Sequence, residues 1–539
     1  MVAANNSLAP PSGKTRPRDE FDYIIIGAGA SGCVVANRLS QDPDISVLLL
    51  DAGGPAPDPP LDEFVMMGSK YDWKYQTEPE PNLNNRRIPW PRGKVFGGSS
   101  SISGMVYLRG NRLDYENWNY LGNQGWSYQE VLPYFRKSES NKQFRNEFHG
   151  SHGPLKVESI TDDSILKKTF LETAETCGFK SDPNWDFNGA KQDGTAGLYQ
   201  KTLKEGKSFN VAAAYLTPVL DRSNLVVRPF SLATRLVWDR QRVTGIEYMS
   251  IAGWDAAENA WLPLLPGLWR LNTARARREV IVCAGVVESP QLLLLSGIGG
   301  AEQLRRHGIP VKVHLPGVGQ NLHDHIVVTL IYKPTANAGN IQDRVGTNGL
   351  LARTRQGLQS ASPDLQLFVL EVLVKQAALG LPAGPLYFCA ACLVKPQSVG
   401  SISLGSADPV AVPLIRANYL QSERDLNALL DGMELIRKFT NSAPLSRYLE
   451  SEQAPGSAFR SREQLKNIVR QTASTNYHPV GTCKMGHDTM AVVDDQLRVH
   501  GVEGLRLADA SIMPTIVNTN TIGPCVMIGE KAAAMIMGN

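Results

Sequence analysis

The 539-residue sequence has no excess of either charge and no long hydrophobic run. Its net charge is only +3 and its basic residues form no dense stripe, so we expect neither nucleic acid nor an anionic membrane as a partner. No stretch of about 18 uninterrupted apolar residues occurs, which predicts that no segment spans a membrane. Residues 1–19 are rich in Pro, Asn and Ser and lack the apolar segment of a secretory signal. We therefore expect a disordered tail and a cytoplasmic protein.

Cysteine is scarce as well. There are seven cysteines, an odd number, and they are scattered singly apart from Cys389 and Cys392. This set predicts reduced thiols rather than a disulfide framework. Cys389 and Cys392 lie in the apolar run LYFCAACLV, which is typical of a buried strand. We expect Cys483 and Cys525 to pack in the core, because free cysteine buries well.

A nucleotide-binding pattern stands near the beginning of the chain. Residues 23–26, YIII, are typical of a buried parallel strand; GAGASG follows at residues 27–32, and residues 33–39 continue as a helix. A second apolar run, Val47–Leu50, ends at Asp51. Strand, glycine turn, helix and terminal acid together predict a dinucleotide-binding βαβ unit. These residues alone leave open whether the dinucleotide is FAD or NAD.

Each residue of this pattern has a physical reason. Gly27 permits the tight turn, Gly29 lets a pyrophosphate approach the backbone, and Gly32 lets the helix pack against the strand. The N-terminus of the helix offers free N–H groups to the phosphates. Asp51 can accept hydrogen bonds from a ribose diol, and it would repel a 2′-phosphate.

Further motifs follow in a fixed order along the chain. The fourth of them contains His478. They are PRGKVFGGSSSISGMVYLRG (residues 91–110), CAGVVESPQLLLLSGIG (283–299), LPGVGQNLHDH (315–325), NYHPVGTCKMG (476–486) and LRLADASIMPTIVNTNTIGPCVMIGEKAAAMI (505–536). In the second motif, Ser289 is expected as an N-cap and Pro290 as the first helical residue.

Together with the βαβ unit, these motifs resemble the glucose–methanol–choline (GMC) oxidoreductase family of FAD enzymes. The resemblance runs from about Phe21 to the last residues and is greatest to bacterial alcohol oxidases and dehydrogenases, both choline dehydrogenase-like and hydroxymethylfurfural oxidase-like. It implies an α/β fold (α+β overall), with a Rossmann-like FAD domain and a substrate domain built on an antiparallel sheet. The expected FAD domain is discontinuous, from residues 20–150, 211–329 and 471–539, and the substrate domain comprises 151–210 and 330–470. The alternating run Ser398–Ser406 is expected as a strand of the second sheet.

The resemblance also implies which residues contact FAD. Ile102 stands where some relatives carry a histidine joined covalently to the flavin, so non-covalent FAD is implied. Ser103 departs from the asparagine common in the family, which keeps a donor on a smaller side chain. The residues expected at the cofactor are Gly27, Gly29, Ala30, Ser31, Gly32, Asp51, Ala52, Arg92, Gly97, Gly98, Ser99, Ser103, Gly104, Met105, Ala233, Ala284, Asp509, Ala510, Asn520 and Thr521.

Two residues are implied as catalytic. His478 matches the histidine of the family's NYHPxGT segment, and Asn520, rather than Asn518, matches the second active-site position. A neutral imidazole can take the hydroxyl proton of an alcohol, and an amide can hold the same oxygen. The implied reaction is oxidation of a primary alcohol to an aldehyde by hydride transfer to flavin N5. Oxygen or another electron acceptor would reoxidise the flavin, and the protein would be a monomer or a dimer.

Rival interpretations remain. His478, Cys483 and His487 are spaced loosely like zinc ligands, but no fourth ligand is apparent and we expect no metal. The cluster His323-Asp324-His325 is expected to be a structural turn that satisfies its own hydrogen bonds. Relatives with non-oxidase chemistry, such as a hydroxynitrile lyase or a fatty-acid photodecarboxylase, are the alternative. A non-catalytic FAD-binding protein is disfavoured, because both polar active-site positions are retained.

The substrate is less constrained by the sequence. Val399 replaces an arginine common in the family, which disfavours an anion site there, although Arg416 could serve. The apolar run Leu367–Phe388 favours an uncharged alcohol, although a buried core explains the same residues.

Overall fold

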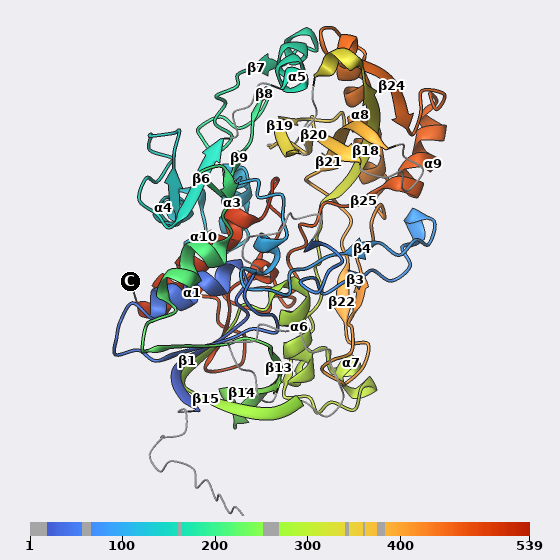
Figure 1. The fold of residues 1–539 in the computed structure, drawn as a ribbon. Coiled ribbons are helices and arrows are strands. Elements are labelled where there is room, and N and C mark those ends of the chain that lie inside the picture. The colour runs from blue at the N-terminus through green and yellow to red at the C-terminus, as the bar shows by residue number, and fades with distance from the viewer. Residues whose placement is uncertain are drawn as a thin grey trace, which may run out of the picture.

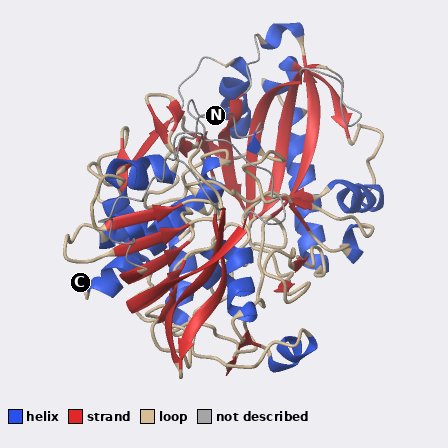
Figure 2. Cartoon of the chain, turned by 60° about the horizontal axis from the view of Figure 1, so that its bottom comes forward, coloured by secondary structure: helices blue, strands red, loops and turns tan. Residues whose placement is uncertain are grey.

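The computed structural model describes residues 19–56, 66–159, 164–251, 269–339, 344–358, 360, 362–374 and 383–538. The expected tail lies outside these ranges, except for Asp19. Two large sheets, of seven and eight strands, dominate the fold (Figures 1 and 2). In Figure 1 the seven-stranded sheet lies at the bottom and the eight-stranded sheet at the top. This arrangement confirms the predicted α/β (α+β) class.

The seven-stranded sheet contains the predicted βαβ unit. Its order is β12-β2-β1-β15-β14-β13, with β26 paired to β15. The half nearest the glycine turn is parallel, and β13, β14 and the start of β15 are antiparallel. The strands are β1 (Glu20–Ile26), β2 (Val47–Leu50), β12 (Leu225–Arg228), β13 (Ser231–Asp239), β14 (Arg242–Ile251), β15 (Trp269–Val282) and β26 (Leu505–Leu507).

Two helices far apart in sequence pack together beside this sheet: α1 (Ala30–Leu39) and α10 (Ile522–Met537). They approach closely because Gly529 faces α1; a Cβ there would lie 2.8 Å from the Cβ of Val34. Arg38 of α1 and Glu530 of α10 form a buried ion pair at 2.6 Å. The C-terminal segment is thereby fixed against the predicted nucleotide-binding turn.

The helix α6 (Gly285–Leu295) corrects one prediction. Ser289 and Pro290, expected at its start, lie inside it. Proline removes the N–H that would bond the carbonyl of Val286, four residues earlier. The hydroxyl of Thr482 donates to that carbonyl instead, at 2.6 Å. A residue of the NYHPVGTCKMG motif thus replaces the hydrogen bond that the proline removes from the helix.

The eight-stranded sheet has the order β24-β18-β21-β20-β19-β8-β7, with β25 paired to β18. All its pairings are antiparallel except that of β7 with β8. The strands are β7 (Lys180–Ser181), β8 (Thr195–Leu198), β18 (Ile326–Pro334), β19 (Arg344–Ala352), β20 (Leu365–Val374), β21 (Gly384–Leu393), β24 (Leu449–Ala454) and β25 (Ser474–Thr475). Helices α5 (Ile165–Thr176), α8 (Glu423–Thr440) and α9 (Arg462–Thr472) belong to this part of the chain. The exact limits of the two domains stay a prediction.

Two strand predictions in this region have different outcomes. Cys389 and Cys392 lie in β21 and are buried, as expected. The run Ser398–Ser406 contributes only β22 (Ser401–Ser403), which pairs with β23 (Leu414–Arg416) in a separate two-stranded sheet. Its alternation is therefore that of a small hairpin-like pair, and its assignment to the large sheet is wrong.

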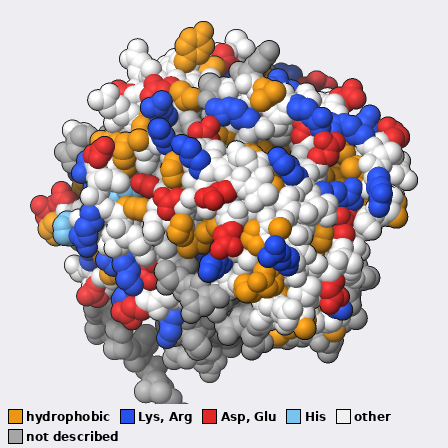
Figure 3. Space-filling model, turned by 90° about the horizontal axis from the view of Figure 1, so that it is seen from above, with side chains coloured by type: hydrophobic (Ala, Val, Ile, Leu, Met, Phe, Trp, Pro, Cys, Tyr) orange, Lys and Arg blue, Asp and Glu red, His pale blue; other side chains and the backbone are white. Residues whose placement is uncertain are grey.

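The remaining elements are short. They are α3 (Arg112–Tyr120), α4 (Tyr128–Ser138), α7 (Ala301–Arg306), β3 (Tyr75–Gln76), β4 (Pro89–Trp90), β5 (Glu139–Asn141), β6 (Leu155–Ser159), β9 (Gln200–Lys201), β10 (Leu203–Lys204), β11 (Lys207–Ser208), β16 (Ile298–Gly299) and β17 (Val313–His314). On the face shown in Figure 3, basic and acidic side chains are interspersed. Within the described ranges, no helix is both long and apolar enough to cross a bilayer.

Candidate active site

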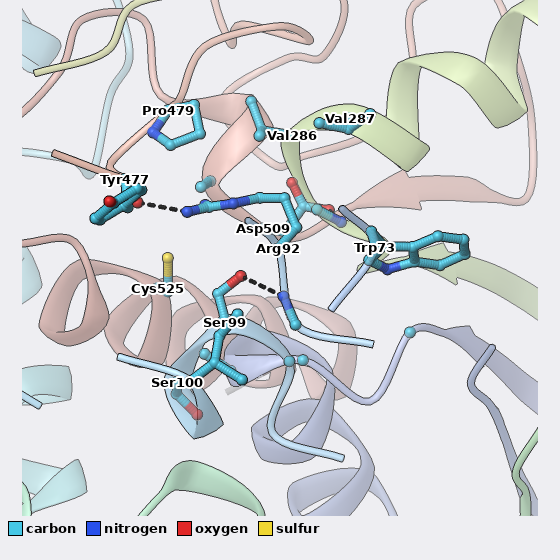
Figure 4. Close-up of a pocket in the computed structure, with 18 of the residues that line it drawn as sticks. Trp73, Arg92, Ser99, Ser100, Val286, Val287, Tyr477, Pro479, Asp509 and Cys525 are labelled. Carbon is cyan, nitrogen blue, oxygen red and sulfur yellow. Dashed lines mark hydrogen bonds between the residues drawn. The ribbon is translucent and has the colours of Figure 1, made fainter. Parts of the chain in front are cut away.

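A cavity of about 370 Å³ is lined by residues of both large sheets and of the loops between them (Figure 4). Most of the predicted site residues line it. They are Gly27, Gly29, Ala30, Ser31, Asp51, Ala52, Arg92, Gly98, Ser99, Ser103, Gly104, Met105, Ala233, Ala284, His478, Asp509, Ala510, Asn520 and Thr521. Segments separated by hundreds of residues are thus brought to one space.

Two predicted residues, Gly32 and Gly97, shape the backbone without lining the cavity. A Cβ on Gly32 would lie 1.9 Å from the carbonyl oxygen of Gly27, so only glycine lets α1 begin this close to the turn. Gly97 has a φ of +87° and donates its N–H to the carbonyl of Ala28 at 2.7 Å. Both hold the glycine turn in place.

The glycine turn itself leaves room at the cavity. Gly27 has a φ of +100°, and a Cβ on it would lie 2.4 Å from the carbonyl oxygen of Cys283. A Cβ on Gly29 would find that same oxygen only at 3.8 Å, as its nearest neighbour. The open space beside Gly29 is where a phosphate can approach the backbone and the N-terminus of α1.

Asp51 stands at the end of β2, on the cavity wall. Its carboxylate accepts the backbone N–H groups of Ala28 and Gly53, both at 2.7 Å. Burial raises the pKa of Asp51 to about 6, although these two hydrogen bonds act in the opposite direction. The side chain therefore braces the glycine turn while presenting an acceptor to the cavity.

A second acid, Asp509, connects its own segment to α6 at the cavity. One carboxylate oxygen accepts the N–H of Gly285 at 2.9 Å and the hydroxyl of Ser289 at 2.6 Å. The other accepts the N–H of Ser511 at 2.7 Å. This explains why Ser289 lies within α6: its hydroxyl serves Asp509, not the helix end.

Arg92 supports the facing loop of the cavity, and Ser99 supports the loop that carries Arg92. The guanidinium of Arg92 donates to the carbonyl of Tyr477 at 2.7 Å, and the N–H of Gly93 donates to the hydroxyl of Ser99 at 3.1 Å (Figure 4). Arg92 therefore holds the residue that precedes His478. Burial lowers the pKa of Arg92.

His478 lies between two side chains that contact its two ring nitrogens. Its Nδ1 is 3.0 Å from Nδ1 of His325, and its Nε2 is 3.1 Å from the amide nitrogen of Asn520. Nε2 of His325 is 3.0 Å from the carbonyl oxygen of Val517. The structure brings Asn520 to His478, whereas the side chain of Asn518 bonds backbone groups elsewhere.

When both rings are neutral, these contacts allow only one placement of the hydrogens on the ring nitrogens. A carbonyl only accepts, so His325 carries its proton on Nε2 and has a lone pair on Nδ1. His478 then donates from Nδ1 and keeps a lone pair on Nε2, which accepts from Asn520. The amide nitrogen of Asn476 lies farther away, at 3.4 Å from Nδ1 of His478.

Both histidines are held neutral. Burial lowers the pKa of His325 to about 3. The pKa of His478 is also lowered, well below its ordinary value, by burial first and then by His325 and Arg92. The lone pair on Nε2 of His478 thus exists throughout the neutral pH range.

The cluster at residues 323–325 corrects a further expectation. His323 does bond within its own turn, to the carbonyl of Asn321. Its neighbours do not: Asp324 accepts the backbone N–H of His478 at 2.9 Å, and His325 contacts the ring. The turn therefore holds His478 directly. Sequence reasoning missed this contact because the two histidines are 153 residues apart.

The cavity wall formed by β20 mixes one polar and two apolar side chains: Gln366, Phe368 and Leu370. Alternate residues, Leu367 and Val369, point into the core of the second sheet. In the described part of the apolar run Leu367–Phe388, only some side chains therefore face the cavity, as strand periodicity requires; residues 375–382 lie outside the described ranges.

Two other residues of the sequence analysis bear on the cavity. Cys525, expected in the core, packs against it and also lines the cavity, where burial raises the pKa of its thiol to about 12. Val399 is 38 % exposed and does not line the cavity. The valine that stands in place of the family's arginine therefore does not contact the cavity.

The loosely spaced residues His478, Cys483 and His487 are not brought together as a metal site. Cys483 is buried with a raised pKa, because burial disfavours the thiolate. His487 lies 3.7 Å from Asp495 instead. Among the described residues, no group of three or more His, Cys, Asp or Glu side chains could hold a metal.

A cavity that combines a dinucleotide-type glycine turn with a neutral, positioned histidine fits a dinucleotide-dependent oxidoreductase. Comparisons with known proteins specify the class. Two family models, both described as GMC oxidoreductase, match residues 21–327 and 396–529. The chain belongs to the GMC oxidoreductase family, and it is an FAD-dependent oxidoreductase.

Individual relatives agree. The chain is 36% identical to an oxygen-dependent choline dehydrogenase of Escherichia coli K12 over 96% of both chains. Among solved structures, pyridoxine 4-oxidase from Mesorbium loti has a TM-score of 0.86 at 27% identity, covering 96% of this chain and 99% of that one. A formate oxidase variant of Aspergillus oryzae RIB40 has a TM-score of 0.85 at 25% identity, covering 97% and 99%.

Proposed function

We propose that this protein oxidises a primary alcohol to an aldehyde, with His478 as the base that takes the hydroxyl proton and Asn520 as its partner. The observation that carries the proposal is the lone pair on Nε2 of His478, a cavity-lining residue: the contact with His325 leaves Nε2 without a hydrogen, and Asn520 donates to it at a point that a substrate hydroxyl can take over. Alcohol oxidation removes one proton and one hydride, and this site contains a group suited to the proton.

The residues of the cavity fit FAD bound without a covalent link. The open space at Gly29 and the N-terminus of α1 suit a pyrophosphate. Asp51 suits the adenosine ribose, and Ala233 on β13 offers backbone groups for adenine. Ile102, buried in the cavity wall, provides no atom to which a flavin could be attached. When bound, FAD supplies the acceptor for the hydride.

The chain's own residues carry out the rest. The substrate hydroxyl takes the place of the Asn520 amide at Nε2 of His478. Asn520 then donates from its amide nitrogen to the hydroxyl oxygen, and the O–H points at Nε2. The proton passes to Nε2 while the hydride leaves the carbinol carbon, and the product is the aldehyde. His325 keeps the other nitrogen of His478 in the donor role throughout. Positioning of this kind contributes up to about 7 kcal/mol to a well-aligned reaction.

The names of the relatives do not agree on one substrate. Choline and pyridoxine carry primary hydroxyl groups, and formate does not. This favours a primary alcohol as the substrate class. It leaves the acceptor as oxygen or another oxidant, since the relatives include both a dehydrogenase and oxidases.

The test is anaerobic titration of the yellow protein with a panel of primary alcohols. We expect loss of the flavin colour together with formation of the matching aldehyde. Peroxide formed on admitting air identifies an oxidase, and reduction of an added acceptor alone identifies a dehydrogenase. Flavin that no alcohol bleaches would contradict the proposed function. Release of intact FAD on acid denaturation tests the non-covalent link.

A further inference from the structure

Gln366 has a carbonyl oxygen without a partner in the wall of the cavity. The residue is 2% exposed, and its Oε1 makes no hydrogen bond to any residue that the structure describes. Buried polar atoms are nearly always paired, and an unpaired one in a binding cavity points to a ligand group that pairs with it.

The direction of the Gln366 amide follows from its neighbours. Asn520 must donate its amide nitrogen to Nε2 of His478, so the Asn520 oxygen faces the other way. That oxygen lies 3.2 Å from the amide nitrogen of Gln366, which therefore donates to it. The remaining atom of Gln366 is an acceptor, and the cavity must supply a donor.

Tyr199 is the neighbour that could supply this donor from within the protein. Its hydroxyl donates instead to the carbonyl of Leu367, at 3.1 Å. The ring occupies the space over Gly349, where a Cβ would lie 2.0 Å from it, and it packs on Phe187 at 4.7 Å between ring centres. The tyrosine is thus held by its own contacts on the cavity wall.

We propose that Gln366 is a specificity-determining residue that accepts a hydrogen bond from a second O–H or N–H group of the substrate. This inference rests on the proposed function, because it places the reacting hydroxyl at His478 and Asn520. The Gln366 amide is hydrogen-bonded directly to the Asn520 amide. The second donor of the substrate therefore lies within a few bonds of the reacting carbon. Phe368 and Leu370, on the same face of β20, surround it with apolar wall.

The substrate class is therefore a primary alcohol with a second donor, such as a short diol. An alcohol with a tertiary or quaternary nitrogen in place of that donor leaves Oε1 unpaired. So does a methyl ether of the same length. A site built to bond a substrate hydroxyl discriminates against analogues that lack it.

The experiment compares kcat/KM for a series of α,ω-diols and their monomethyl ethers. In the wild-type holoenzyme we expect the best diol to exceed its ether by about 10-fold, the worth of one neutral hydrogen bond. Gln366→Met should remove this preference, whereas Gln366→Glu should retain it, because a carboxylate still accepts. Both variants remove the amide nitrogen that donates to Asn520. A fall in kcat that is equal for the diol and the ether therefore reports the changed position of Asn520 alone.

Tyr199→Phe is the matched control, since it removes the nearby hydroxyl and leaves the Gln366 oxygen. We expect it to keep the diol preference. Loss of preference in Tyr199→Phe, or equal rates for diols and ethers in the wild type, would overturn the inference while leaving the proposed function intact. If no alcohol in the series reduces the flavin, the proposed function fails first. Flavin absorbance per chain verifies that each variant is folded and loaded.

Discussion

Nδ1 of His325 lies 3.0 Å from Nδ1 of His478, and only one hydrogen can stand between them. Because the other nitrogen of His325 faces the carbonyl of Val517, that hydrogen belongs to His478. A buried histidine on β18's N-terminal flank thus fixes the tautomer of the proposed base without facing the substrate.

The first prediction concerns this pair. His325→Gln should lower kcat/KM for alcohols by about 10- to 100-fold, the usual effect of removing a group that orients a catalytic one. The flavin should remain bound. His323→Gln is the matched control, because His323 bonds the carbonyl of Asn321 instead. Equal losses in the two variants would show that the turn acts only by folding.

The second prediction concerns pH. A base must be neutral to accept a proton, and burial lowers the pKa of His478 well below its ordinary value. The proposed reaction should therefore retain its rate as the pH falls through about 6.5, the ordinary pKa of histidine, and lose it only below. The measurement is kcat/KM for one alcohol against pH. An acidic limb centred above that value would contradict the assignment.

The third prediction distinguishes two glycines of one motif. Gly32→Ala places a Cβ 1.9 Å from the carbonyl oxygen of Gly27 and should prevent stable folding of the turn. Gly29→Ala meets no atom closer than 3.8 Å and should fold, yet its methyl group enters the cavity. We expect Gly29→Ala to yield soluble protein with little flavin, measured by absorbance and thermal unfolding. Full flavin content would show that the pyrophosphate does not lie there.

The fourth prediction concerns Asp51. Asp51→Ala removes the acceptor for the N–H groups of Ala28 and Gly53, and each buried group left unpaired costs about 1–3 kcal/mol. We expect lower flavin content and a lower melting temperature than in the wild type. Asp51→Glu keeps the carboxylate and should retain more flavin. Wild-type flavin content in Asp51→Ala would contradict the ribose assignment.

Local patterns in the sequence predicted local structure well. The strand before Gly27, the helix after it and the strand Val47–Leu50 are all confirmed, because apolar runs and glycine spacing determine them over short distances. The start of α6 was not predictable from its own segment. Thr482, nearly 200 residues away, satisfies the carbonyl that Pro290 leaves free, and so the helix continues through the proline.

The candidate site shows the same division. Family-like motifs indicated His478 and Asn520, and the structure brings the two side chains together. They did not indicate His325, which the pairing of β18 with β25 brings to His478, or Gln366, whose contact with Asn520 joins β20 to the segment before α10. A single glutamine in an apolar strand belongs to no sequence pattern that predicts its contact with Asn520.

The most direct test of the account is the anaerobic rate at which an alcohol reduces the bound flavin in the wild type and in His478→Ala. Removal of a general base lowers such a step by about 10²- to 10⁴-fold. The account predicts a loss of this size with the flavin content unchanged. A variant that retains its flavin and reduces it at the wild-type rate would contradict the assignment of His478 as the base.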